Sequence, residues 1–196
     1  MPEQLILVMM VVGTLALVIL GVIILIAKFY RRVEQGKVLI VNTMKAEPIV
    51  TFTGAVVYPG IHRAEVMDIS VKTITIHCHG KDAVLCADDV RADIKVVFFV
   101  RVNKTTEDIL KVAQSVGCER ASDPRALEEL FSARFSEALY TVAGHLDYKT
   151  LFKDRARCKD EIISIIGMDM NGFVLEDAAI ELVARTPIDE LEGASP

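Results

Sequence analysis

The chain has 196 residues, of which 52% are hydrophobic, and its mean hydropathy is +0.40. Both values are high for a soluble domain. The excess is local, because residues 5–27 carry no charge, whereas residues 28–196 hold all 22 Lys and Arg and 26 of the 27 Asp and Glu. This distribution excludes a wholly soluble protein, a transporter with many membrane spans and a disordered chain. The net charge of −5 argues against nucleic acid as a partner.

The apolar stretch at residues 5–27 predicts an uncleaved transmembrane helix. At a rise of 1.5 Å per residue its length is about 35 Å, enough to cross a hydrocarbon core of about 30 Å. A cleaved signal peptide is disfavoured, because residues 1–4 contain no Lys or Arg and no small-x-small cleavage site follows the stretch. The residues expected to anchor the chain in the membrane include Leu5, Leu15, Gly21 and Ala27.

Basic side chains gather on one side of this helix. Lys28, Arg31, Arg32 and Lys37 follow it, whereas Glu3 precedes it. By the positive-inside rule, residues 1–4 lie outside and the C-terminal domain lies in the cytoplasm. Residues 28–36 then form a basic juxtamembrane segment. The same four basic residues could bind anionic lipid headgroups, although a role as topology determinants alone is the simpler interpretation.

The sequence from residue 37 to residue 103 is typical of strands. Short β-branched segments occupy residues 37–42, 49–52 and 55–58, and residues 71–76 alternate. The clearest strand covers residues 92–102, where apolar side chains recur at every second position. Val97 and Phe99 are apolar on its opposite face, so we expect something to cover part of that face too.

Helical signals follow this strand. Thr105 and Asp108 form a capping box at the start of the first predicted helix, and Asp123 before Pro124 begins the second. Asp147 is expected to begin a third helix that ends at Gly167. Its apolar side would consist of Phe152, Ala156, Ile163 and Ile166.

A last strand is predicted at residues 173–184. The order of strands, then helices, then a strand predicts an α+β fold with a mainly antiparallel sheet and packed helices, preceded by a single transmembrane helix.

No catalytic motif is present in the sequence, which has no Walker A loop, no GxSxG elbow and no HExxH pair. We therefore predict no enzymatic activity and no cofactor. The four cysteines form no CxxC pair, which is typical of reduced thiols in the cytoplasm. They are Cys78, Cys86, Cys118 and Cys158.

Residues 77–82 (HCHGKD) carry the sequence's one candidate metal site. A two-residue hairpin with Gly80 at its first central position would place four metal-ligand types on one face, namely His77, His79, Asp82 and Cys86. Strand ends often have this composition for reasons of turn geometry alone. We therefore predict exposed turn residues and no metal.

Several segments resemble the SPFH (band 7) family, which includes stomatin, prohibitin, flotillin and the HflK/HflC pair. Residues 30–40 (YRRVEQGKVLI) are similar to the entry into that domain. Residues 89–103 (DVRADIKVVFFVRVN), 177–181 (DAAIE) and 185–188 (RTPI) resemble bacterial inner-membrane flotillins more than stomatins. Together with residues 127–131 (LEELF) and 135–139 (FSEAL), the resemblance covers residues 1–190. It implies an SPFH domain at residues 37–187 and a tail at residues 188–196.

The resemblance implies a function as well as a fold. SPFH proteins are scaffolds that oligomerise on a membrane, define lipid microdomains and recruit partner proteins, and bacterial flotillins pair with NfeD-type membrane proteins. The alternative is a regulator of a membrane protease, as for HflK/HflC. That pair presents its SPFH domain outside the cytoplasm, so topology separates the two functions.

Two further expectations come from the resemblance. Apolar residues of the first strands dip into the inner leaflet in this family, and the candidates here are Val50, Phe52, Val56 and Val57, with sheet core as the equal alternative. Flotillins also continue into a long coiled coil after the Thr-Pro motif, whereas only nine residues follow Pro187 here. We expect either a truncated relative or fragment, or oligomer contacts made by the SPFH domain itself.

Overall fold

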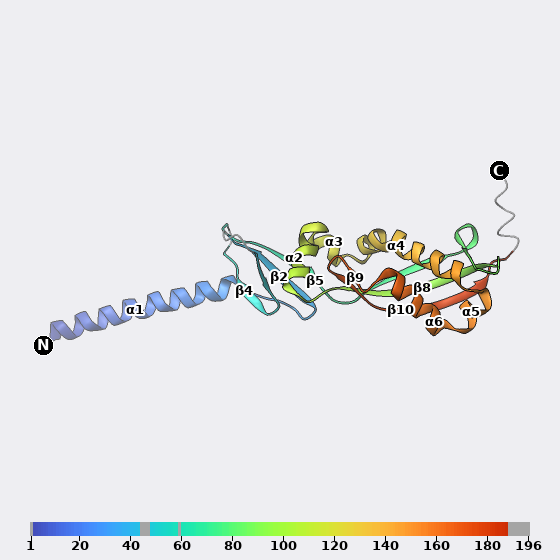
Figure 1. Ribbon diagram of the computed structural model, residues 1–196. Coiled ribbons are helices and arrows are strands. Elements are labelled where there is room, and N and C mark those ends of the chain that lie inside the picture. The colour runs from blue at the N-terminus through green and yellow to red at the C-terminus, as the bar shows by residue number, and fades with distance from the viewer. Residues whose placement is uncertain (1, 44–47, 59, 188–196) are drawn as a thin grey trace. The chain divides into compact units, whose positions relative to one another are not determined.

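The computed structural model describes residues 2–43, 48–58 and 60–187, with side chains from residue 8 onward. The chain divides into two compact units, Met1–Val66 (unit 1) and Met67–Pro196 (unit 2). Figure 1 shows the order of the elements along the chain. Each unit is described by itself.

Unit 1 consists of one long helix and short strands. The helix α1 (Pro2–Phe29) contains the candidate membrane span Val8–Phe29, which has a mean hydropathy of 3.0 and no buried residue. The strands form a two-stranded sheet, β1-β4, and a three-stranded sheet, β3-β2-β5. Their bounds are β1 Tyr30–Arg32, β2 Lys37–Asn42, β3 Ile49–Thr51, β4 Gly54–Val56 and β5 Arg63–Asp68.

A small apolar core holds these strands together. Leu39 and Val41 on β2 and Val57 after β4 are buried, and Val33, Ala55 and Ala64 pack against them. Leu39 lies across from Thr51, and Val41 across from Ile49. The β2 residues Val38 to Val41 are all buried, so burial does not alternate along this strand.

Unit 2 is built on a longer antiparallel sheet in the order β6-β8-β10-β9, with β7 also paired to β8. The two central strands, β8 and β10, are long and pair from Ala92 to Val102 of β8, with two bulges in β10. The bounds are β6 Lys72–Cys78, β7 Val84–Leu85, β8 Arg91–Val102, β9 Asp169–Met170 and β10 Phe173–Arg185. The strands predicted at 92–102 and 173–184 are confirmed within one residue.

Helices cover one face of this sheet. On β8 the alternate residues from Ala92 to Val102 are all buried, and Phe98 stacks on Phe135 of α4 with ring centroids 4.3 Å apart. The helix α4 contacts β6, α6 contacts β10, and the two helices contact each other. Figure 1 shows α4 running along the sheet. The helices are α2 Thr106–Ser115, α3 Cys118–Ser122, α4 Pro124–His145, α5 Tyr148–Lys153 and α6 Arg155–Ile166.

The opposite face of the sheet is open apart from its middle. Val97 is buried and Phe99 half-buried, but Thr73 and Ala179 on the neighbouring strands are exposed. In the described part of the chain, the cover predicted for this face is thus confined to the surroundings of Val97.

The predicted helix starts are confirmed at two positions. The Thr105 hydroxyl accepts a hydrogen bond from the Asp108 N–H, 3.2 Å away, and caps α2. The Asp123 carboxylate accepts one from the Arg125 N–H, with Pro124 in the first turn of α4. These side chains satisfy N–H groups that a helix leaves free at its start.

The third predicted helix is wrong in one respect, because the chain forms two helices there. Asp154 interrupts the helical conformation and caps α6 by accepting from the Arg157 N–H. The break shifts the helical phase, so Phe152 and Ala156 are exposed. Ile166 is buried as predicted, and the other buried side chains are Leu151, Cys158 and Ile162. The α+β class with an N-terminal apolar helix and antiparallel sheets is confirmed.

Candidate membrane-facing site

The end of α1 continues into the strands of unit 1 without a linker. The helix ends at Phe29 and β1 begins at Tyr30. The Val57 N–H donates to the Phe29 carbonyl oxygen at 3.0 Å, and the rings of Phe29 and Tyr58 lie 6.0 Å apart. The ring of His62 lies edge-on to the Tyr58 ring, with centroids 5.6 Å apart. Backbone pairing and ring contacts thus fix the helix end to the strands.

The pairing of β1 with β4 orders the residues beyond the helix. Tyr30 lies across from Val56, and Arg32 across from Gly54. Glycine is needed at position 54 because a Cβ there would lie 2.6 Å from the Arg31 carbonyl oxygen and 3.0 Å from the Tyr30 hydroxyl. The absence of a side chain lets the Tyr30 ring lie against the β4 backbone beside Arg32.

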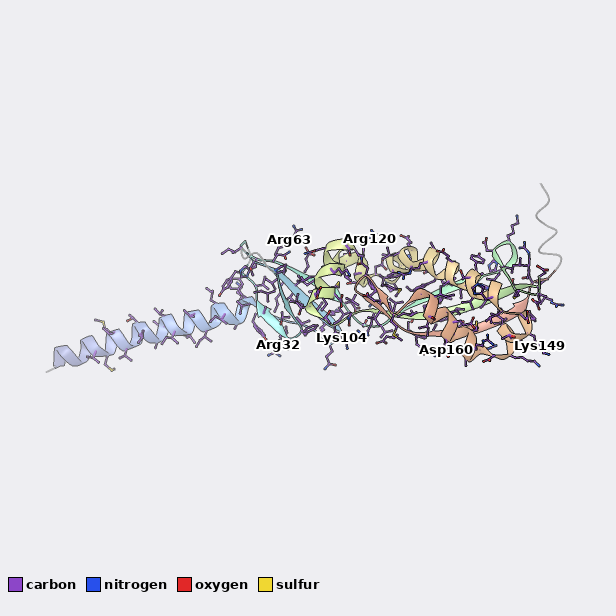
Figure 2. All side chains as sticks on the ribbon, in the orientation of Figure 1. Arg32, Arg63, Lys104, Arg120, Lys149 and Asp160 are labelled. Carbon is purple, nitrogen blue, oxygen red and sulfur yellow. The ribbon has the colours of Figure 1, made fainter. Side chains whose placement is uncertain are left out.

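Three of the four predicted basic residues remain available at this junction. Lys28, Arg31 and Arg32 are exposed, and none of them forms an ion pair with any other residue whose placement is described. Arg32 lies close to the end of α1 in Figure 2. Unneutralised cationic groups beside an apolar helix are suited to an anionic membrane surface.

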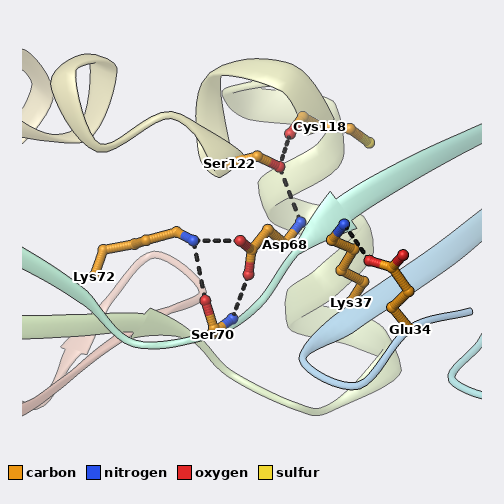
Figure 3. A network of polar contacts seen from close by, with 7 residues as sticks. All are labelled: Glu34, Lys37, Asp68, Ser70, Lys72, Cys118 and Ser122. Carbon is orange, nitrogen blue, oxygen red and sulfur yellow. Dashed lines mark hydrogen bonds and ion pairs between the residues drawn. The ribbon is translucent and has the colours of Figure 1, made fainter.

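Lys37 differs from these three residues. Its ammonium forms an ion pair with Glu34 at 2.6 Å, shown in Figure 3. The hydrogen bond and the charge of Lys37 lower the pKa of the Glu34 carboxyl. Lys37, the first residue of β2, is therefore already partnered by Glu34.

A shallow groove of about 650 Å³ separates the last two turns of α1 from β1. Its lining combines apolar helix residues with two residues of the strand. They are Ile23, Ile26, Ala27, Tyr30 and Arg32.

The four residues considered for leaflet insertion lie in different environments. Val57 belongs to the small core of unit 1, and Val50 and Val56 are half-buried. Phe52 is 44% exposed, but it lies beyond the far end of β1, because the Val33 N–H donates to the Thr53 carbonyl oxygen. The register therefore separates Phe52 from the helix end.

Two other apolar side chains are both exposed and close to the helix end. Tyr58 contacts Phe29, and Ile61 follows in a turn that its N–H closes onto the Tyr58 carbonyl oxygen at 3.2 Å. Their exposed fractions are 42% and 57%. The Pro-Gly turn at residues 59–60 marks this segment in the sequence, but its closeness to α1 depends on the β1–β4 register.

Two of the remaining predicted anchor residues, Leu15 and Ala27, are exposed on α1, as is the backbone at Gly21. An exposed apolar helix surface of this length requires an apolar environment. The side chain of Leu5 lies outside the described residues.

The hairpin predicted at residues 77–82 is wrong. β6 and β7 do not pair with each other but both pair with β8, so that His77 lies across from Lys95 and Val84 across from Ala92. Gly80–Asp82 forms a short 3₁₀ turn between them. The His77 and His79 rings contact each other, whereas Cys86 is buried. Among the described residues, no group of three or more His, Cys, Asp or Glu is arranged to hold a metal ion.

The four cysteines are all buried, and none forms a disulfide. Burial raises the pKa of the Cys86 thiol to about 11 and that of Cys158 to about 12. Thiols that remain protonated and inaccessible are poor nucleophiles and metal ligands. They act here as small apolar side chains of the unit 2 core.

These features define a class of protein in which an α+β domain continues directly from a candidate transmembrane helix. The chain belongs to the SPFH domain / Band 7 family, which matches residues 31–191, and the resemblance noted in the sequence is confirmed.

Two relatives are inner-membrane flotillins. The flotillin family inner membrane protein YqiK of Escherichia coli (strain K12) is 28% identical over 174 residues, which cover 87% of this chain and 31% of YqiK. The flotillin family inner membrane protein sll1021 of Synechocystis sp. (strain ATCC 27184 / PCC 6803 / Kazusa) is 24% identical over 146 residues, covering 72% of this chain and 21% of the relative. The chain thus spans less than a third of the length of these curated relatives.

Proposed function

We propose that the protein is a flotillin-like scaffold that oligomerises at the inner membrane, organises lipid and protein microdomains and recruits partner membrane proteins. The direct continuation of α1 into the SPFH domain carries the proposal. Strands joined to a membrane helix without a linker stay at the bilayer surface, where they can order neighbouring molecules. SPFH and flotillin proteins are generally non-enzymatic scaffolds, which supports a function without catalysis.

In this proposal α1 spans the membrane and the SPFH domain lies on the cytoplasmic side. The support is the exposed set Lys28, Arg31 and Arg32, because Lys and Arg next to a span are retained on the cytoplasmic side. An SPFH domain on the opposite side would favour the alternative function, a regulator of a membrane protease like HflK/HflC.

Labelling with a membrane-impermeant maleimide tests this orientation. In Lys149→Cys, whose site is exposed on unit 2, we expect labelling only after the membrane is permeabilised. In Glu3→Cys we expect labelling in intact spheroplasts. The four native thiols are buried and should contribute little background. The reverse pattern would refute the cytoplasmic orientation and leave the protease-regulator alternative.

We assign leaflet contact to Tyr58 and Ile61, and not to the four residues chosen from the sequence. Both are exposed beside the end of α1, and tyrosine is enriched at membrane interfaces. The double variant Tyr58→Ser and Ile61→Ser should reduce the extent to which lipid-bound quenchers quench the fluorescence of a label on unit 1. Phe52→Ser should not reduce this quenching. Equal effects of the two changes would refute this assignment.

The open face of the unit 2 sheet is our candidate for the oligomer contact. Half-buried Phe99 and exposed Leu182 lie on it, between the ion pairs Lys95–Glu181 and Arg101–Glu176. Apolar residues surrounded by charged and polar ones are a common form of protein interface. Ala179→Arg should therefore reduce the particle mass in nanodiscs, measured by mass photometry.

Ala156→Arg is the matched control, because Ala156 is also exposed but lies on α6. A native particle no larger than one protomer would refute oligomerisation, and equal effects of the two variants would refute this face. For the recruited partner we propose an NfeD-type membrane protein, on the strength of the family resemblance. Co-purification from native membranes followed by identification of the bound proteins tests that assignment.

A further inference from the structure

The groove at the end of α1 joins an apolar wall to one exposed arginine. We propose that it binds one anionic phospholipid of the cytoplasmic leaflet, with an acyl chain against Ile23, Ile26 and Ala27 and the phosphate at Arg32. This inference rests on the proposed insertion of α1 into the membrane. It goes beyond a diffuse attraction of lipid to basic residues, because it assigns one groove and one of the three exposed basic side chains.

The apolar wall is one continuous stripe of the helix. Positions 23, 26 and 27 follow the i, i+3, i+4 spacing that places side chains on a single helix face. Ile23 and Ile26 are 57% and 46% exposed, so no other described part of unit 1 fills this face. In an inserted helix the stripe lies at the end of the span, where acyl chains meet their headgroups.

The polar end of the groove is selective because side chains alternate along a strand. Tyr30 and Arg32 point to one face of β1, whereas Arg31 points to the other. Both Tyr30 and Arg32 line the groove, and neither Arg31 nor Lys28 does. Two adjacent arginines of equal charge therefore have different geometric access to the same lipid.

The Tyr30 hydroxyl is held on the same side of β1 as Arg32. The residue across from Arg32 is Gly54, and because it has no side chain the Tyr30 hydroxyl end lies over it. A guanidinium donates two parallel N–H groups to phosphate oxygens, and a phenol can donate a third hydrogen bond. Arg32 has no ion-pair partner among the described residues that would compete with the lipid.

The shape and charge of the groove together select the ligand class. Its volume of about 650 Å³ falls within the range of small-molecule sites. A free phosphate would use only the cationic end, and a phosphocholine headgroup would bring a cation close to Lys28 and Arg31. An anionic phospholipid satisfies both ends of the groove.

Native mass spectrometry of the full chain released from nanodiscs tests the proposal. The probe is an equimolar mixture of phosphatidylglycerol and phosphatidylcholine. We expect one retained phosphatidylglycerol per protomer. Arg32→Gln should reduce this retention about fivefold, corresponding to about 1 kcal/mol for a basic residue at an anionic surface. Arg31→Gln, the matched control, should change it less than about twofold.

A second variant tests the apolar wall without changing charge. Ala27→Phe fills the groove with an aromatic ring and should reduce phosphatidylglycerol retention, while α1 keeps its hydrophobicity. Equal losses in Arg31→Gln and Arg32→Gln would overturn the proposal in favour of diffuse attraction. Unchanged retention in Ala27→Phe, equal retention of phosphatidylcholine, or displacement by millimolar inorganic phosphate would also overturn it.

A negative result in this lipid-binding test can be distinguished from a failure of the proposed scaffold function. A symmetric nanodisc offers phosphatidylglycerol on both sides, so lipid retention does not depend on topology or on oligomer size. A monomer that retains the lipid would refute the scaffold and leave the groove. A failure of α1 to insert would be seen separately, because the protein would not be recovered in nanodiscs.

Discussion

The two units of this chain are stabilised in different ways. In unit 2, strands of 12 and 13 residues pair along most of their length. The helices α2 to α6 follow β8 in the chain. In unit 1, apart from the helix, strands of three to six residues enclose a small core. Of the described residues of unit 1, only Val38, Leu39, Ile40, Val41 and Val57 are buried apolar ones.

Among the described residues, unit 1 outside α1 also exposes large apolar side chains at a higher density than unit 2, which exposes eight of them over a much longer segment. Outside α1, six of its large apolar residues are more than 40% exposed, namely Tyr30, Ile49, Phe52, Tyr58, Ile61 and Val66. A two-stranded sheet is marginally stable alone in water, and a small sheet needs a covered apolar face or a packed helix for stability. The comparison indicates that unit 2 is held by its own core, whereas unit 1 depends on its connection to α1 and on the environment of that helix.

The largest effect is expected in the unit 2 core. Phe135→Ala removes a fully buried ring that stacks on Phe98 and contacts Phe131, and it should lower the free energy of unfolding by about 3–5 kcal/mol. Chemical denaturation followed by circular dichroism measures the loss. Leu130→Ala on the same helix, at a residue 43% exposed, should cost less than about 1 kcal/mol. Similar losses in both variants would contradict the packing described for α4.

Glycine-to-alanine changes should have opposite signs in the two units. Gly54→Ala places a Cβ 2.6 Å from the Arg31 carbonyl oxygen, and it should weaken the β1–β4 pairing by about 1–3 kcal/mol. Gly144→Ala lies in α4, where a Cβ meets no atom within 4 Å, and it should stabilise unit 2 by up to about 1 kcal/mol.

Amide hydrogen exchange shows which strands each of these two substitutions affects. Amides of β1 and β4 should lose protection in Gly54→Ala while β8 and β10 keep theirs. Loss of protection throughout both units would show that they do not unfold separately, which would refute the comparison.

The sequence predicted the strands and helix starts of unit 2 better than the arrangement of unit 1. Periods of two in β8 and capping residues at Thr105 and Asp123 are local signals, and local geometry satisfied them. Local signals could not predict which of residues 49–61 lie near the membrane helix, because that depends on which end of β4 lies next to Phe29. The break at Asp154 was missed because Asp147 also fits a cap, and the sequence does not show that the Asp154 side chain caps a second helix.

A smaller effect is expected from the polar network at the start of unit 2. Figure 3 shows the Asp68 carboxylate accepting hydrogen bonds from Lys72 and from the Ser70 N–H, while the Asp68 N–H donates to the Ser122 hydroxyl. Partial burial raises the pKa of Asp68, but the hydrogen bonds from Lys72 and Ser70 outweigh it, and the pKa is lowered overall. Asp68→Asn should therefore destabilise unit 2 by about 1–2 kcal/mol at pH 7.

The sign of the pH dependence follows from this lowered pKa. The contribution of Asp68 is fully present above the ordinary carboxyl pKa of about 4 and is lost as the pH falls through the lower folded value. The stability difference between the native sequence and Asp68→Asn should shrink when denaturation is repeated at pH 3. A difference that grows on acidification would show that Asp68 is not held as a carboxylate. Ser70→Ala, which keeps the backbone donor, should show the smaller loss.

The smallest effect is expected for maleimide labelling of the buried thiols. Their low reactivity measures how rarely the core of unit 2 opens to solvent. With pKa values of about 11 and 12, Cys86 and Cys158 are thiolates in only about one molecule in 10³ and 10⁴ at pH 8. Maleimide should therefore leave both thiols unmodified over hours in the native protein, whereas the exposed thiol of Lys149→Cys reacts within minutes. Phe135→Ala should raise the reactivity of Cys86 and Cys158, because opening of the core exposes them, while Gly54→Ala should not. If Gly54→Ala exposed these thiols as strongly as Phe135→Ala does, the stability of unit 2 would depend on unit 1, and the two units would be one cooperative structure.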